Sequence, residues 1–181
     1  MLLGLFLTGC IDTFNRETVS TQTTQVGDFQ VKETIYHTGD WPDHTFERVY
    51  RAAHDNGRWI DLGDFEDESD TGIVYSPLVV DDQLIVFSSA HVFLWRPGEE
   101  PDQFNPFEAE GWYDYSQEKQ INGHYDYLAS DVWANNDQVL LSYVCDSCQA
   151  NKPNALMFYS LDNGQTFDIC LNPSADFTTC N

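Results

Sequence analysis

Turn signals recur at short intervals along this chain and separate runs that are rich in β-branched and aromatic residues. Asp55-Asn56-Gly57 lies between Phe46–His54 and Arg58–Leu62. Asn-Gly is a strong hairpin signal because both residues accept a positive φ. The same alternation of strand-like run and turn continues through Val26–Thr38, Val74–Val80, Leu84–Ser89, His91–Arg96, Val132–Ala134, Val139–Val144, Leu156–Ser160 and Phe167–Leu171. These runs predict an all-β fold, built as an antiparallel meander of hairpins.

The spacing of the turns narrows the fold class. Pro77–Arg96 and Asp131–Ser160 each predict a strand, a tight turn and two further strands, and their turns lie about one propeller blade apart in the sequence. The chain has 181 residues, which leaves room for about three such units, fewer than the usual four or more blades. We therefore expect an incomplete β-propeller-like array or a β-sandwich. Glu99–Gln120 lacks a strand pattern and is expected to be a long surface loop.

The first ten residues predict processing rather than folding. An apolar run, Met1–Leu7, is followed by the small residues Thr8 and Gly9 and then by Cys10. Leu7-Thr8-Gly9-Cys10 resembles the lipobox of bacterial lipoproteins, in which the peptide is cleaved before the cysteine and the thiol receives a lipid. No Lys or Arg precedes the run, so we expect a start further upstream or a trimmed leader. The alternative is a buried N-terminal strand with a free cysteine.

The lipobox resemblance implies a division of the chain into three parts. Residues 1–9 would be the signal peptide, residues 10–25 a flexible tether and residues 26–181 a single β domain. The tether is polar and rich in Ser, Thr and Gln, as flexible linkers are. Ile11 after the lipidated cysteine favours the outer membrane under the enterobacterial sorting rule. We therefore expect a periplasmic protein that is held to the bacterial outer membrane by lipid alone.

The remaining cysteines agree with an oxidising compartment. Cys145, Cys148, Cys170 and Cys180 all lie in the last quarter of the chain. Four cysteines in such a compartment predict two disulfides, with three possible pairings. We favour Cys145–Cys148 with Cys170–Cys180, because each bond closes a local loop, and cross-pairing is the rival. The spacing of Cys145 and Cys148 would also fit a zinc site or a redox-active Cys-x-x-Cys.

One internal motif is specific. Ser160-Leu161-Asp162-Asn163-Gly164-Gln165-Thr166-Phe167 resembles the Asp-box, a structural motif on the outer hairpins of many β-propeller blades. In such a turn we expect Asp162 to accept hydrogen bonds from nearby backbone amides and Gly164 to adopt a positive φ. Phe167 should pack the turn onto the sheet. The resemblance implies a blade-like hairpin and no particular activity.

The charge of the chain excludes several partners. The chain has 30 acidic and 8 basic residues and a net charge of −22, which repels phosphate and anionic lipid. Nucleic-acid binding is therefore not expected. The densest acidic run comprises Asp61, Asp64, Glu66, Asp67, Glu68 and Asp70. This run is a solvated loop, a docking patch for a basic partner or a calcium site, although it lacks the EF-hand order.

No catalytic signature stands out in the sequence. A nucleophile elbow, a phosphate loop and a His-Glu-x-x-His motif are all missing. With 30 carboxylates, no particular pair can be nominated for glycoside hydrolysis. We expect neither catalytic residues nor a metal or other cofactor, calcium being the one alternative. Trp59, Trp95 and Trp133 are expected in the core, whereas Trp41 and Trp112 lie near predicted loops and are either core residues or exposed anchors.

These features together resemble a class of binding proteins. A small, acidic, lipid-anchored β domain without a catalytic signature is similar to the immunity lipoproteins that neutralise type VI secretion effectors, many of which are lipases. The resemblance implies a non-enzymatic inhibitor that occludes the active site of a secreted toxin. Asp61–Asp70 would steer the partner, and Trp112, Tyr113 and Tyr115 would plug its cleft. The alternatives are a carbohydrate-binding or glycoside-hydrolysing surface lipoprotein and an envelope scaffold protein.

Overall fold

The described part of the molecule consists of three antiparallel sheets, each with four strands. The computed structural model describes residues 16–38, 45–67, 75–88, 90–121, 127–135, 138–145, 148, 152–175 and 178–180. In each sheet the strands follow one another in chain order, so that every sheet is a simple meander. The predicted all-β fold is therefore confirmed.

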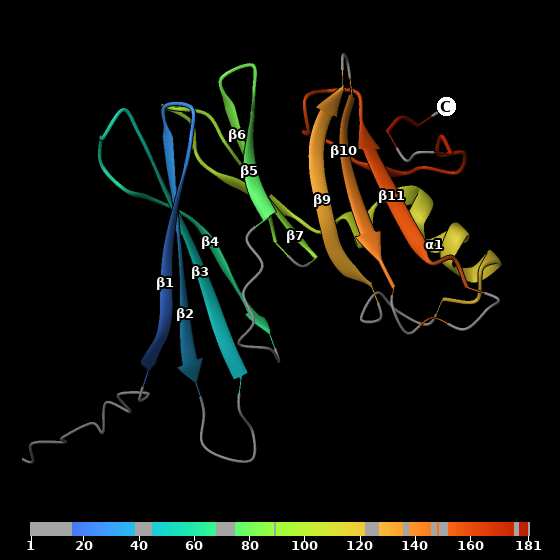
Figure 1. Cartoon of the computed structure of the whole chain (residues 1–181), viewed down its shortest axis with the longest axis horizontal. Coiled ribbons are helices and arrows are strands. Elements are labelled where there is room, and N and C mark those ends of the chain that lie inside the picture. Colours follow the sequence, from blue (N-terminus) through green and yellow to red (C-terminus); the bar gives the residue numbers. More distant parts are fainter. Residues whose placement is uncertain are drawn as a thin grey trace, which may run out of the picture.

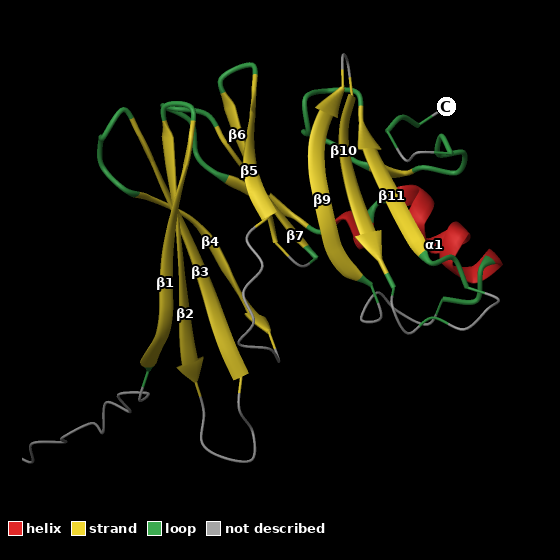
Figure 2. Cartoon of the chain, viewed as in Figure 1, coloured by secondary structure: helices red, strands yellow, loops and turns green. Residues whose placement is uncertain are grey.

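The strands have the following bounds. The first sheet contains β1 (Glu17–Val26), β2 (Phe29–Thr38), β3 (Thr45–His54) and β4 (Ile60–Asp67). The second sheet contains β5 (Tyr75–Val80), β6 (Gln83–Ser88), β7 (His91–Trp95) and β8 (Asp102–Phe104). The third sheet contains β9 (Leu128–Asn135), β10 (Gln138–Val144), β11 (Ala155–Ser160) and β12 (Asp168–Ile169). A 3₁₀ helix, η1 (Pro106–Glu108), and an α-helix, α1 (Glu110–Glu118), lie between the second and third sheets in the sequence (Figure 2).

The three sheets stand side by side in chain order, with β5–β8 between the other two (Figure 1). The first strand of each sheet contacts the first strand of the next, β1 with β5 and β5 with β9. Sequential four-stranded meanders with neighbouring first strands are arranged like consecutive blades of a β-propeller. This arrangement matches the propeller-like alternative rather than a two-sheet sandwich.

The predicted hairpin turns form as their residue types require. Asp55 and Asn56 have φ values of 50° and 56° and join β3 to β4. Asp81 and Asp82 have φ values of 49° and 60° and join β5 to β6. Asp and Asn tolerate this left-handed region better than most other residues do. The local chemistry of these turns therefore fixes where the strands begin and end.

Two core clusters lie between the sheets, one on each face of β6. All residues of this strand are therefore buried. Leu84 and Val86 of β6 pack in a cluster with residues of the first sheet. Ile85 and Phe87 belong to a larger cluster with residues of the third sheet. A strand covered on both faces has a continuous apolar run, which is the pattern of the sequence here.

A buried polar network also joins the first and second sheets. Tyr50 Oη donates to Glu33 Oε1 at 2.5 Å and lies 2.5 Å from Ser88 Oγ. Arg48 Nη1 lies 3.3 Å from the same Glu33 oxygen, and all four side chains are buried. Burial, together with the neighbouring Glu33 charge, raises the pKa of Tyr50 far above its ordinary value. These hydrogen bonds satisfy the polar groups that the sheet contact removes from water.

The structure corrects the expected boundary of the tether. Residues 17–25, which the sequence predicts to be part of it, belong to β1, and this strand pairs with β2 from Glu17↔His37 to Val26↔Phe29. Val26–Thr38 is accordingly a hairpin end and a strand rather than one extended run. Gly27, at a φ of 54°, turns the chain back so that this segment pairs with β2, and its Thr and Val residues are compatible with the extended backbone. Residues 10–15 lie outside the described residues.

The prediction that Glu99–Gln120 is a long surface loop is also wrong. The segment contains β8, η1 and α1. Pro106 stands at the start of η1, and Asn105 caps it by accepting a hydrogen bond from the Phe107 backbone amide at 3.0 Å. Phe107 is buried in the larger core cluster, so aromatic residues of this segment fill the core instead of covering a loop.

Of the predictions for the tryptophans, one is confirmed and one is wrong. Trp95 is buried in the core as expected, and Trp133 is partly buried. Trp59 is 39% exposed because it precedes β4 in the turn region, so its expected core position is wrong. Trp41 lies outside the described residues.

Candidate functional site

The predicted acidic run begins as a row on the exposed side of β4. Asp61, Asp64 and Glu66 are exposed in this strand, and the side chain of Asp67 lies outside the described part, as do Glu68 and Asp70. Asp61 pairs with Arg51 of β3, whose Nε lies 2.5 Å from Asp61 Oδ1. The described residues give no ion pair to the other two carboxylates.

The predicted aromatic segment lies on α1, where its three aromatic residues have different surroundings. Trp112 is only 8% exposed and packs edge-on against Phe107 with ring centroids 4.9 Å apart. Tyr113 is 68% exposed, whereas Tyr115 is half-buried. The helical period turns these residues to different sides. Trp112 is therefore a core residue, and its expected role as a plug for a partner's cleft is wrong.

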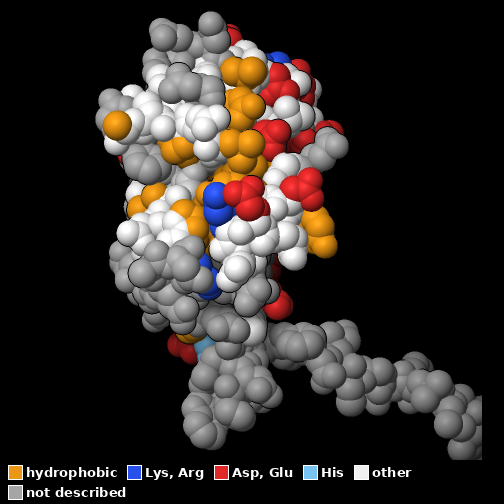
Figure 3. All heavy atoms as spheres, turned by 90° about the vertical axis from the view of Figure 1, so that its right-hand side faces the viewer, with side chains coloured by type: hydrophobic (Ala, Val, Ile, Leu, Met, Phe, Trp, Pro, Cys, Tyr) orange, Lys and Arg blue, Asp and Glu red, His pale blue; other side chains and the backbone are white. Residues whose placement is uncertain are grey.

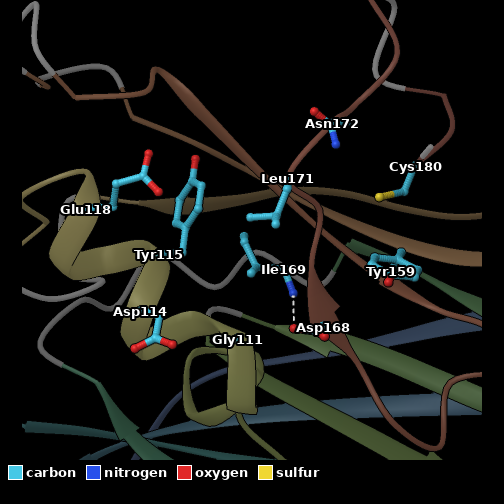
Figure 4. Close-up of a pocket in the computed structure, with 10 residues that line it drawn as sticks. All are labelled: Gly111, Asp114, Tyr115, Glu118, Tyr159, Asp168, Ile169, Leu171, Asn172 and Cys180. Carbon is cyan, nitrogen blue, oxygen red and sulfur yellow. Dashed lines mark hydrogen bonds between the residues drawn. The ribbon is translucent and has the colours of Figure 1, made fainter.

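A pocket of about 400 Å³ lies beside α1 (Figure 4). One wall is α1, and the other walls come from β11, β12 and the segment that follows β12. The lining residues are Gly111, Asp114, Tyr115, Glu118, Tyr159, Asp168, Ile169, Leu171, Asn172 and Cys180. Pockets of this size hold small ligands. The site therefore combines a cavity with polar and aromatic groups. The structure describes no such cavity at the acidic row on β4.

The wall formed by α1 lies close to β12 because residue 111 is glycine. A Cβ atom at this position would collide with Asp168 Oδ1 and approach Ile169 Cγ2 to 3.3 Å. A side chain at this position would displace the Asp168 carboxylate and press on Ile169, so glycine allows the closest approach of the helix to the edge strand. Asp168 Oδ1 also accepts a hydrogen bond from the Ile169 backbone amide at 2.8 Å, which fixes the carboxylate at the pocket wall.

The opposite wall is held by the C-terminal segment. A disulfide joins Cys170 to Cys180, and Gln138 Nε2 donates to the Cys180 carbonyl oxygen at 3.1 Å. The Cys180 amide in turn donates to Gln138 Oε1 at 3.3 Å. This pair of hydrogen bonds imitates a strand pairing between β10 and the C-terminal segment. The segment therefore stays on the outer face of the third sheet.

The pocket lining is acidic. It contains the carboxylates of Asp114, Glu118 and Asp168, and none of its ten lining residues is Lys or Arg. Glu118 is partly neutralised by Lys119, whose Nζ lies 2.6 Å from Glu118 Oε1. Partial burial raises the pKa of Tyr115, and the nearby Lys119 charge opposes the effect. The tyrosine is therefore neutral near pH 7 and presents an electron-rich ring to the pocket.

The turn between β11 and β12 has the hydrogen bonds expected from its sequence. Asp162 Oδ1 accepts from the Thr166 amide at 2.9 Å, and Ser160 Oγ accepts from the Gly164 amide at 2.8 Å. Gly164 has a φ of 89°, and Phe167 is buried in the core. Partial burial would raise the pKa of Asp162, but hydrogen bonds from Ser160 and Thr166 outweigh it and lower the pKa. This turn has a structural role.

The four C-terminal cysteines pair locally. The bonds are Cys145–Cys148, with an S–S distance of 2.02 Å, and Cys170–Cys180, at 2.06 Å. The favoured pairing is thus confirmed. The zinc alternative is not supported, because a thiol in a disulfide is no thiolate ligand.

One further group has the composition of a metal site. Ligand atoms of Asp28, His54 and Asp55 lie within 4.8 Å of one another at two adjacent turns of the first sheet. The two aspartates are exposed and His54 is partly exposed, and His54 Nδ1 lies 3.5 Å from Asp55 Oδ2. Exposed groups of this kind are common without an ion, so the cluster is weaker than the pocket as a candidate site.

Only part of the pocket follows from the sequence. The sequence points to Tyr115 and the segment Gly111–Tyr115 but not to Tyr159 and Asp168, which β11 and β12 bring opposite one another in register. Their outward position could have been inferred from strand alternation around the buried Phe158. The acidic row on β4 and the α1 surface lie at opposite ends of the sheet array (Figure 1), so the structure does not join them into one patch.

Comparison with known proteins adds no identification. No protein-family model matches the chain, and a search of curated proteins finds no relative. None of the helices in the described ranges is long and apolar enough to cross a membrane. Cys10, the predicted lipidation site, lies outside these ranges.

Proposed function

We propose that this protein is a lipid-anchored protein of the bacterial envelope that binds and neutralises another protein, as an immunity protein does for a secreted toxin. The observation that carries this proposal is the exposed surface of α1. Tyr113 is 68% exposed there and is followed in the helix by Asp114 and Glu118. An exposed aromatic residue among polar groups is a frequent anchor of protein interfaces.

The charge of this surface selects a basic partner. The net charge of −22 attracts cationic proteins over a distance that salt shortens. Asp64 and Glu66 on β4 add to this field at the other end of the array without entering the contact. In this mechanism the acidic residues raise the association rate, and Tyr113 makes the lasting contact that covers the partner's active site.

A genetic and a biochemical measurement test the proposal. The neighbouring reading frames are searched for a toxin, and its product is exported to the periplasm of a test strain with and without this protein. The surviving cells are then counted. We expect co-expression to restore growth and Tyr113→Ala to weaken binding of the purified pair about tenfold or more. Trp59→Ala, which removes an exposed aromatic residue in the turn before β4, is the matched control and should change neither growth nor binding.

One observation favours a second candidate function. The pocket beside α1 combines two tyrosine rings with carboxylate and amide groups, a set of groups that also binds sugars. A carbohydrate-binding protein would bind a soluble glycan without any protein partner. Two results together would replace the first proposal by this one. The protein would fail to protect cells in the survival assay, and it would bind a glycan in a way that Tyr115→Ala abolishes.

A further inference from the structure

We propose that the pocket between α1, β12 and the C-terminal segment receives an arginine side chain of the partner protein. This inference rests on the proposed function, because it names the group by which a basic partner is recognised. The pocket is open to solvent, and Figure 4 shows Tyr115 and Glu118 of α1 on one side of Ile169 and Leu171, with Tyr159 and Cys180 on the other side.

The shape of the pocket fits a long side chain with a planar end. Its volume of about 400 Å³ exceeds what a single ion needs and has room for a whole arginine side chain. Ile169 and Leu171 provide apolar surface for the methylene groups of an arginine. The rings of Tyr115 and Tyr159 lie on different sides of this apolar surface (Figure 4), so one guanidinium group can stack on one of them at a time. The Lys119 ammonium already lies 5.8 Å from the centroid of the Tyr115 ring, which makes the Tyr159 ring the stacking surface for the arginine.

The charges of the pocket favour a cation over a neutral or anionic group. Lys119 already pairs with Glu118, which leaves the carboxylates of Asp114 and Asp168 without a basic neighbour among the lining residues. Asp168 uses one oxygen to accept the Ile169 amide and retains acceptor capacity on the other. Two acceptor groups on separate walls match the several N–H donors of a guanidinium better than the compact charge of a lysine ammonium.

The first experiment measures binding of a small probe by the full chain. N-acetyl-arginine N-methylamide is titrated into ¹⁵N-labelled protein, and its neutral citrulline counterpart serves as the matched probe. We expect millimolar binding of the arginine probe, with chemical-shift changes at the amides of Asp168, Ile169 and Leu171. The citrulline probe should leave these amides unchanged, because it has the same length without the charge.

Variants test which carboxylates bind the probe. Asp114→Asn and Asp168→Asn should each weaken arginine binding about threefold or more, since each removes one charge from the site. Asp82→Asn makes the same charge change in the turn between β5 and β6, where Asn tolerates the φ of 60°, and should have no effect. Unchanged thermal unfolding of the variants shows that the fold is intact.

The outcomes separate this inference from the proposed function. Equal binding of both probes, shift changes away from the pocket, or binding of a neutral methyl glycoside in place of arginine would each overturn it. If Tyr113→Ala weakens binding to the toxin while Asp168→Asn does not, the arginine pocket is wrong and the proposed function stands. If arginine binds as expected but no protein is neutralised, the pocket stands and the proposed function is wrong.

Discussion

The first and third sheets have the same strand order but opposite surfaces on their outer faces. Across the first sheet, cross-strand neighbours on this face are Thr23, Lys32, Arg51 and Asp61. Across the third sheet they are Trp133, Leu140, Tyr159 and Asp168. A polar outer face ends a stack of repeats without needing a cover, as in the terminal repeats of solenoid proteins. An apolar outer face needs a cover.

The chain covers the third sheet with its own C-terminal segment. Leu140 and Met157 are fully buried in a small cluster with Cys170, and Trp133 and Tyr159 pack against it. Leu128 and Leu171 remain exposed, and Figure 3 shows hydrophobic side chains in a band along this side of the molecule with acidic groups at its edge. The cover is therefore partial, and the candidate pocket lies where it meets α1.

The same contrast extends to the inner faces. The contact between the first and second sheets contains the network of Glu33, Arg48, Tyr50 and Ser88. In the contact between the second and third sheets, the buried hydroxyl of Tyr143 has no hydrogen-bond partner among the described residues. The contact between the first and second sheets thus has a buried charged network within its apolar core. The core between the second and third sheets is apolar, and the polar contacts there, from Gln83 Nε2 to the Asn163 carbonyl oxygen and from Asn163 Nδ2 to Asp81, involve the turns.

Truncating one outward residue in each sheet should give the largest difference. Leu140→Ala in the third sheet should lower the free energy of unfolding by about 3 kcal/mol, because it leaves a cavity under the C-terminal segment. Val49→Ala, at the half-buried position on the outer face of the first sheet, should cost less than about 1 kcal/mol. Chemical denaturation of both variants measures the values. Equal losses would mean that the two faces do not differ in burial.

Removing the disulfide that holds the cover should have the next largest effect. Replacing Cys170 and Cys180 together by Ser should cost about 2–3 kcal/mol and abolish arginine binding, because the bond spans ten residues and forms the pocket wall. The matched pair is Cys145 and Cys148, only three residues apart, whose replacement should cost about 1–2 kcal/mol. This second variant should keep arginine binding. Loss of binding in both would argue for a general effect on the fold.

The two buried tyrosines provide a smaller contrast. Tyr50→Phe should cost about 1–3 kcal/mol, because it removes a hydrogen-bond donor from the buried Glu33 carboxylate. Tyr143→Phe should be neutral or slightly stabilising, since its hydroxyl makes no hydrogen bond among the described residues. Thermal unfolding monitored by near-UV circular dichroism compares the two. A larger loss for Tyr143→Phe would contradict the polar and apolar assignment of the two contacts.

The same tyrosines predict a pH dependence. Burial raises the pKa of both above the ordinary value of about 10. A pKa that is raised in the folded state gives stability that is complete below the unfolded pKa and is lost as the pH rises above it. Unfolding should therefore become easier above about pH 10. Replacing both residues by Phe should flatten this alkaline limb, and an unchanged limb would contradict the assignment.

The parts of the fold that depend on local chemistry could be predicted from the sequence. Asp55, Asn56 and Gly164 mark turns because their residue types accept a positive φ, and the two disulfides close loops near in sequence. The strand β1 could not be recognised because its Thr, Ser and Gln residues resemble a linker, and only pairing with β2 makes it a strand. The helix α1 escaped prediction because Trp112 is ordered by packing on Phe107 and Phe158 rather than by helix propensity.

The pocket was harder to predict for the same physical reason. Its walls come from α1, β11, β12 and the end of the chain, and none of these segments is complete as a site alone. Pairing of Tyr159 with Asp168 and the absence of a side chain at Gly111 bring the walls together. Alternation along a strand gives the side to which a residue points, but it does not say which helix will lie opposite.

Reversing exposed charges at the first sheet should have the smallest effect on stability and still test function. Asp64→Lys with Glu66→Lys should leave the unfolding transition nearly unchanged, because both side chains are exposed on β4. The association rate with the neutralised toxin should fall and lose part of its salt dependence, since steering acts at a distance. Stopped-flow mixing at low and high salt measures both. The dissociation rate should stay constant if Tyr113 makes the lasting contact, and a rise would place β4 inside the interface instead.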